Sequence, residues 1–128
     1  LMARFLSSEW FAEVDKLVAS AGDLKLTPAM REAEINLTVT SPSGSTRAYV
    51  KDGLVHEGHS GTAPTSITLD EALARKIFVE ADAAAGIAAF VSGELVAAGD
   101  LKPLVALQME EPSAEQKALA KRIAAVTD

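Results

Sequence analysis

The residues best suited to chemistry in this sequence are two histidines and a set of carboxylates, since the chain has no cysteine. His56 and His59 could bind a metal ion together with Glu57 or Asp52. Residues three apart on a strand point to opposite faces, so such a site requires a turn that folds back. Loop histidines without a metal are far commoner, and we predict no metal site.

A second candidate is the segment Gly53–Ser60, which nearly spells a phosphate-binding loop. The position that needs lysine holds His59, and the segment follows a hairpin turn instead of joining a strand to a helix. Lysine is the residue that reaches the phosphates, so we interpret the match as chance.

The carboxylates Asp70, Glu71, Asp82 and Asp100 each stand where a helix start favours an acid. No serine occupies a nucleophile elbow, and thiol catalysis is excluded. We therefore predict a non-catalytic protein with no catalytic residues and no cofactor. General acid–base work by a carboxylate facing a cavity stays open as an alternative.

Composition narrows the class of protein. The 128 residues fit one domain, residues 1–128, and 48% of them are apolar with few aromatics. The formal charge of −6 disfavours nucleic acid and anionic membranes as partners. The longest apolar run, Ala83–Val91, is far shorter than the ~20 residues that span a bilayer, so we expect no stable membrane insertion. Absent cysteine fits a reducing compartment, and we expect the cytoplasm.

The elements expected first are a helix and a set of strands. Ser7 can cap a helix that is apolar at Trp10, Val14, Leu17 and Val18 and stops at Gly22. Pro28 opens either a short turn of helix or a loop. Alternating residues predict strands over 35–40, 46–51, 54–57 and 65–69, with Asp52-Gly53 as a hairpin turn.

Helices around one late strand are expected next. Thr68 and Glu71 form a capping-box pattern, and Asp82 can cap the following helix through Phe90. Residues 93–97 predict the last strand, with a helix over 101–109. Pro112-Ser113 with Gln116 predicts a final helix. Its Lys117, Lys121 and Arg122 are interpreted as a solvated face, with a weak membrane or donor-protein contact as the alternative.

The segment Ala89–Leu101 resembles the Ala-Phe-x-x-Gly-Lys-Leu-x-Val-x-Gly-Asp motif of the sterol carrier protein 2 family. Ile67–Leu73 is similar to that family's strand and first capped helix, and Glu9–Phe11 resembles the start of many bacterial single-domain members. The order of elements matches over most of the chain, and motif identity is confined to about Ile67–Gln108.

The resemblance implies an α+β fold with a five-stranded, mostly antiparallel sheet and helices packed on one face, enclosing an apolar tunnel. It implies a non-catalytic carrier for a fatty acid, a fatty acyl-CoA or a sterol-like lipid. Glu94 departs from the family's usual Lys, which weakens any role of that position with anionic head groups. Gln108 falls where animal members have a Gln near the tunnel mouth, so it is a candidate polar contact.

Segments that are apolar all round must be covered by protein or by a ligand. Ile77–Val79, Phe90 and the cluster Leu101–Leu107 have this character. A vacant cavity of ~300 Å³ would cost about 7 kcal/mol, so a true tunnel should be occupied or partly collapsed. The predicted lipid-binding wall is Trp10, Val14, Leu37, Ile77, Phe78, Ile87, Phe90, Leu104 and Leu107, with Gln108 at the mouth.

We expect the partner to be a small hydrophobic ligand, and many flexible aliphatic residues favour a fatty-acyl chain over a sterol. Phe90→Asp is expected to abolish lipid binding or folding. Two other classes stay open: a small enzyme acting on a hydrophobic substrate, and a structural or interaction domain with a closed core. A homodimer is compatible with the last of these.

Overall fold

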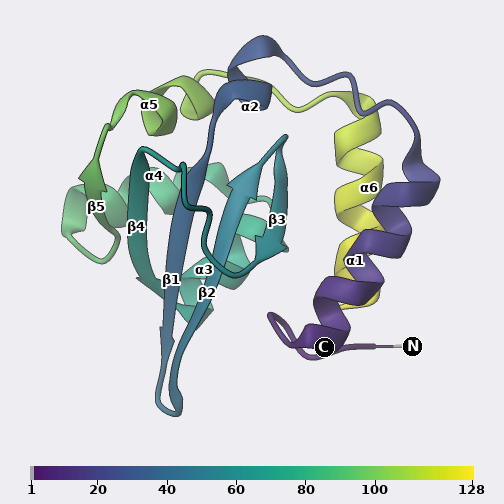
Figure 1. The fold of residues 1–128 in the computed structure, drawn as a ribbon, viewed down its shortest axis with the longest axis horizontal. Helices are drawn as coiled ribbons and strands as arrows, with labels where there is room; N and C mark the ends of the chain where they lie inside the picture. Colours follow the sequence, from purple (N-terminus) through teal and green to yellow (C-terminus); the bar gives the residue numbers. More distant parts are fainter. Residues whose placement is uncertain (1) are drawn as a thin grey trace.

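The computed structural model describes residues 2–128 as a five-stranded sheet with six helices around it (Figure 1). The strands are β1 (Ile35–Ser41), β2 (Gly44–Lys51), β3 (Leu54–Glu57), β4 (Thr65–Asp70) and β5 (Val96–Gly99). The helices are α1 (Ser8–Ala21), α2 (Pro28–Glu32), α3 (Glu71–Phe78), α4 (Ala83–Ser92), α5 (Lys102–Gln108) and α6 (Ala114–Ala125).

The strand order is β3-β2-β1-β4-β5, and every neighbouring pair is antiparallel except β1 with β4. The predicted five-stranded, mostly antiparallel sheet is therefore confirmed. The parallel pair places Ile35 opposite Thr65 and Val39 opposite Leu69. It exists because the chain passes from β3 over the sheet in the 58–64 loop before β4 begins.

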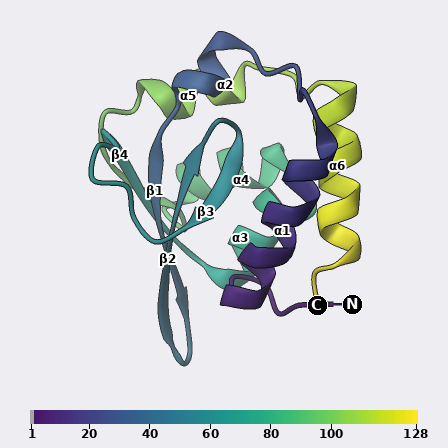
Figure 2. The same cartoon turned by 45° about the vertical axis from the view of Figure 1, so that its right-hand side comes forward.

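Alternating residues give the sheet one buried and one polar face. Alternate positions of β1, β2 and β4 are buried, namely Ile35, Leu37, Val39, Ala48, Val50, Ile67 and Leu69. Helices α3 and α4 lie behind this face, while α1 and α6 run side by side at the β3 end (Figures 1 and 2). Short helices α2 and α5 contact each other above one end of the sheet.

Most local signals in the sequence act as expected. The Ser7 hydroxyl accepts a hydrogen bond from the Trp10 amide, and Gly22 ends α1. Ser113 and Gln116 form the full capping box of α6. Asp52 and Gly53 both have positive φ, which the two-residue hairpin turn requires. Pro28 opens a short helix, with Thr27 as its N-cap.

Two boundaries differ from the sequence prediction. Thr68 lies inside β4, and Asp70 is the N-cap of α3, where its Oδ1 accepts a hydrogen bond from the Leu73 amide. The last strand begins at Val96 instead of residue 93, because Gly93 takes the left-handed conformation that ends α4. Strand β5 pairs with β4 from Val96 to Gly99. It therefore starts three residues later and ends two residues later than the predicted strand over 93–97.

Candidate ligand-binding site

Exposed apolar side chains are concentrated in one part of the chain. Residues 2–128 contain eight large apolar side chains that are exposed, and the one outside the range 87–109 is Met2. The other seven lie on the consecutive elements α4, β5 and α5 or beside them, at the β5 edge away from α1 and α6 (Figure 1). They are Ile87, Phe90, Val91, Val96, Leu101, Val105 and Met109.

Helix α4 turns its small residues inward and its large residues outward. The Asp82 side chain caps it by accepting a hydrogen bond from the Ala85 amide at 3.1 Å. Its buried residues are Gly86 and Ala89, whereas Ile87 and Phe90 are each 49% exposed. A helix without a polar face normally lies inside a protein, so this outward apolar surface requires a cover.

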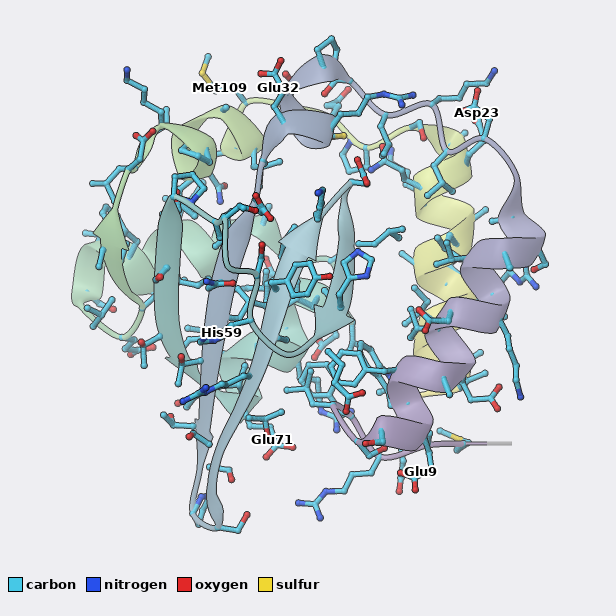
Figure 3. All side chains as sticks on the ribbon, viewed as in Figure 1. Glu9, Asp23, Glu32, His59, Glu71 and Met109 are labelled. Atoms are coloured by element: carbon cyan, nitrogen blue, oxygen red, sulfur yellow. The ribbon has the colours of Figure 1, made fainter. Side chains whose placement is uncertain are left out.

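Helix α5 has four apolar residues between Pro103 and Gln108 and no buried residue. Leu104 and Leu107 pack against the core from one side, while Val105 is 59% exposed on another. Met109 projects outward just beyond its end (Figure 3). The helix is positioned by Asp100, whose Oδ1 accepts a hydrogen bond from the Lys102 amide at 3.0 Å.

The three elements meet at a seam formed by Ile77 of α3, Gly86 of α4 and Gln108 at the end of α5. A Cβ atom added to Gly86 would lie 3.4 Å from Cδ1 of Ile77 and 3.9 Å from Nε2 of Gln108. The absent side chain at position 86 therefore lets the α3 and α5 residues approach α4. Of the predicted site residues, Ile77 and Gln108 come together here, and Ile87 lies next to Gly86 in the chain.

The remaining predicted wall residues lie at different depths. Phe78, Leu104 and Leu107 are partly buried and pack against the core cluster. Trp10, Val14 and Leu37 are fully enclosed core residues, with exposed fractions of 2% or less. The Trp10 indole is held by a hydrogen bond from its Nε1 to Oγ1 of Thr127 at 2.8 Å. No signal in the sequence pointed to this contact across 117 positions.

Two hollows in the surface lie at the opposite end of the sheet from this seam. One, of about 240 Å³, lies between the N-terminal segment and the β1–β2 hairpin and is lined by Arg4, Phe5 and Thr46 among others. The other, of about 710 Å³, is lined by charged residues that include Arg75 and Lys76. Neither is lined by a predicted wall residue.

The histidines have structural contacts on the polar face of the sheet. The ring of His56 stacks on Tyr49 with centroids 4.9 Å apart. His59, labelled in Figure 3, donates a hydrogen bond from Nε2 to the backbone oxygen of Leu37 at 2.8 Å. Within residues 2–128 no three His, Asp or Glu side chains are arranged to hold a metal ion.

The 58–64 loop is fixed by Glu34, which precedes β1. The Ser60 hydroxyl donates to the Glu34 carboxylate, and the Thr62 hydroxyl lies 2.9 and 2.8 Å from its two oxygens. Asn36 adds a reciprocal pair of hydrogen bonds with the Ser60 backbone. The hydrogen bonds from Ser60 and then Thr62 hold the pKa of Glu34 below its ordinary value.

Two of the carboxylates considered for catalysis, those of Asp70 and Asp82, are helix N-caps. Asp70, Asp82 and Asp100 each accept a hydrogen bond from a backbone amide at the start of α3, α4 or α5. Such bonds fix these carboxylates at helix starts.

In the part of the chain that the structure describes, no helix has the length and hydropathy needed to cross a membrane.

Comparison with solved structures defines the fold. The chain is similar to sterol carrier protein 2 from Yarrowia lipolytica at a TM-score of 0.53 and 16% identity, covering 93% of this chain and 97% of that one. It is similar to sterol carrier protein domain 2 of Helicoverpa armigera at a TM-score of 0.53 and 12% identity, covering 98% and 95%. A UbiJ-SCP2 ubiquinone synthesis protein matches at a TM-score of 0.50 and 18% identity, covering 88% and 94%.

No family model matches the sequence, and comparison with curated proteins finds no match. The likeness therefore lies in the arrangement of strands and helices. The chain has the α+β fold of sterol carrier protein 2 domains, as the resemblance predicted.

Proposed function

We propose that this protein is a non-catalytic carrier that binds a hydrophobic ligand at the seam of α3, α4 and α5. The observation that carries the proposal is the apolar surface of α4 and α5, where large apolar side chains face solvent, while the described residues outside the range 87–109 contain one such exposed side chain, Met2. Covering that surface removes apolar area from water at ~25 cal/mol per Å². A ligand bound there would be covered by Ile77, Ile87, Phe90, Leu104 and Leu107.

The ligand class follows from the shape of the side chains and from the fold. Sterol carrier protein 2 domains share this architecture, and the candidates are a fatty acid, a fatty acyl-CoA or a sterol-like lipid. Aliphatic side chains dominate the seam, which favours a long alkyl chain. Cysteine is absent, which suits a reducing compartment, and we propose the cytoplasm as the location.

A carrier is favoured over an enzyme by the polar group that reaches the seam. Gln108 carries an amide, which donates and accepts hydrogen bonds but transfers no proton near neutral pH. The carboxylates of Asp82 and Asp100 accept hydrogen bonds from backbone amides at the starts of α4 and α5. This arrangement supports binding and orientation of a ligand without bond making or breaking.

The decisive experiment is native mass spectrometry of the purified protein followed by denaturing extraction and lipid analysis. We expect the purified protein to contain about one equivalent of bound lipid. If it is purified in the apo form, we expect it to bind about one equivalent of decanol, used as a simple alkyl ligand, on titration. An apo mass that does not shift with alkyl ligands would contradict the proposal.

Paired variants place the ligand. The double variant Ile87→Ser/Phe90→Ser should bind the ligand at least tenfold more weakly, because two large apolar contacts are lost. Both side chains are about half exposed, so the fold should tolerate the change. Met2→Ser removes the exposed large apolar side chain outside the range 87–109 and should bind as the parent does. Equal loss in both would place the ligand elsewhere.

A second function is supported by the same surface. Exposed apolar residues on adjacent elements also mark protein interfaces, and a closed-core interaction domain would use them to form a homodimer. Analytical ultracentrifugation separates the two proposals. A concentration-dependent dimer that Ile87→Ser/Phe90→Ser abolishes, in lipid-free protein, would favour the interaction domain.

A further inference from the structure

We propose that the ligand of the α3–α4–α5 seam has a head group without negative charge, so that an uncharged lipid is preferred to a fatty-acid anion or an acyl-CoA. This inference rests on the proposed function and specifies its ligand class. It comes from the distribution of charge around the exposed apolar surface, together with the chemistry of the polar group at the seam.

Most of the net negative charge of the chain comes from the region that contains α4, β5 and α5. Residues 80–111 contain six of the 18 acidic residues and one of the 12 basic residues, so their net charge is −5 against −6 for the complete sequence. The remaining three quarters of the chain are close to neutral. An anion approaching α4 and α5 therefore meets most of the protein's net negative charge.

The acidic residues lie directly beside the apolar elements. Asp82 precedes α4 and Glu94 follows it, Asp100 precedes α5, and Glu110 and Glu111 follow Met109. The ion pairs of residues 2–128 lie elsewhere in the chain, between Lys16 and Glu13 and between Lys25 and Asp23. The acids around the seam thus carry no neutralising side-chain partner.

The basic side chains of α3, Arg75 and Lys76, line the hollow beside the β1–β2 turn. The one basic residue of the region, Lys102, begins α5, whereas Gln108 ends it, and six residues of helix separate them by ~9 Å. The neutral amide of Gln108 is the side chain beside Ile77 and Gly86. An amide pairs well with a hydroxyl or carbonyl oxygen, while a carboxylate or phosphate is better matched by lysine or arginine.

The electrostatic preference is a long-range effect and must depend on salt. Five net charges at about 10–15 Å should weaken the binding of a monovalent anion about fivefold at 10 mM ionic strength, where the Debye length is ~30 Å. At 150 mM the Debye length falls to ~8 Å, and the effect should shrink below about twofold. An uncharged ligand should show neither change.

The test compares decanol with decanoate, which share one alkyl chain, by calorimetric titration of the apo protein at pH 7. Alcohol and carboxylate also differ in hydration, so the readout is the change in the ratio of their dissociation constants between 10 and 150 mM ionic strength. Glu94→Lys changes the local charge beside α4, and Asp15→Lys makes the same change on the exposed face of α1 as its matched control.

We expect decanoate binding to strengthen relative to decanol as salt is added, and Glu94→Lys to improve decanoate binding more than Asp15→Lys does. If decanol binds but the ratio responds to neither salt nor Glu94→Lys, or if decanoate binds more tightly than decanol at 10 mM, the charge inference is overturned while the carrier function stands. If neither ligand binds, the carrier function fails and the inference fails with it.

Discussion

Gly99, the last residue of the edge strand β5, occupies a position that only glycine can fill without strain. Its φ of +83° is a conformation that residues with a side chain rarely adopt, and a Cβ atom there would collide with the backbone oxygen of Pro64. That oxygen accepts a hydrogen bond from the Asp100 amide at 3.0 Å, which directs the chain from β5 toward α5. Gly99 thus allows the end of β5 to approach the residue that precedes β4.

Gly99→Ala should lower the free energy of unfolding by about 2–4 kcal/mol, because it adds a backbone clash to an unfavourable φ. Gly93→Ala is the matched control, since Gly93 has a φ of +87° but open space around its Cβ position, and should cost about 1 kcal/mol. Urea unfolding of both variants measures the difference. Equal losses of unfolding free energy in the two variants would show that the close contact with Pro64 does not contribute to the cost of Gly99→Ala.

Glu34 gives the 58–64 loop a pH dependence. Hydrogen bonds from Ser60 and Thr62 lower its folded pKa below the ordinary 4.5. A depressed folded pKa stabilises the fold above the unfolded pKa, and this stabilisation is lost as pH falls through the folded value. We expect the amide signals of Ser60 and Thr62 to shift below about pH 4.5 in NMR spectra.

Glu34→Gln should abolish that transition, while Glu32→Gln, exposed on the neighbouring helix α2, should leave it in place. A titration of the loop that persists unchanged in Glu34→Gln would assign the pH dependence to another group.

At the scale of elements, α1 and α6 are joined by a buried hydrogen bond. Oγ1 of Thr127 accepts from the Trp10 indole and donates to the backbone oxygen of Ile123 at 2.6 Å. Thr127→Val keeps the shape but leaves the indole N–H without a partner, which should cost about 1–3 kcal/mol in urea unfolding. Thr46→Val, on the exposed part of β2, should stay within ~0.5 kcal/mol. A loss of that small size in Thr127→Val would contradict the assigned bond.

Elements whose ends carry local chemistry were predictable from the sequence. Ser7, Asp82 and the Ser113–Gln116 pair satisfy backbone amides within three residues, so a short motif defines each helix start. Thr68 was assigned wrongly because Asp70, two residues later, is an equally good cap and β4 pairing takes Thr68. Whether a residue such as Thr68 pairs in a strand or caps a helix depends on tertiary contacts, which a short stretch of sequence does not reveal.

The site was predictable only in outline. Ile77, Ile87 and Phe90 could be selected because they lie in apolar segments, whereas Gln108 was selected only through the family resemblance. A helix such as Ala83–Ser92 has no polar face, so its sequence does not reveal that Gly86 and Ala89 point inward and Phe90 outward. The parallel pairing of β1 with β4 was likewise out of reach, because it depends on how the 58–64 loop is anchored.

For the whole molecule, ligand binding should change stability unevenly. A ligand at 100 times its dissociation constant should raise the free energy of unfolding by ~2.7 kcal/mol. Hydrogen exchange should slow most in α4 and α5, which have few buried residues and open most easily. Exchange mass spectrometry with and without decanol measures this. Protection confined to α1 and α6 would point to a different binding place.

The two ends of the described chain lie next to each other in a parallel bridge between Ala3 and Thr127. The Ala3 amide donates to Val126 at 2.7 Å, and the Asp128 amide donates to Ala3 at 2.8 Å. Tension applied through the two ends would pull these parallel segments in opposite directions along their length. Both bonds would then bear the load together in shear instead of opening in turn, and the hydrogen bond between Trp10 and Thr127 would share that load.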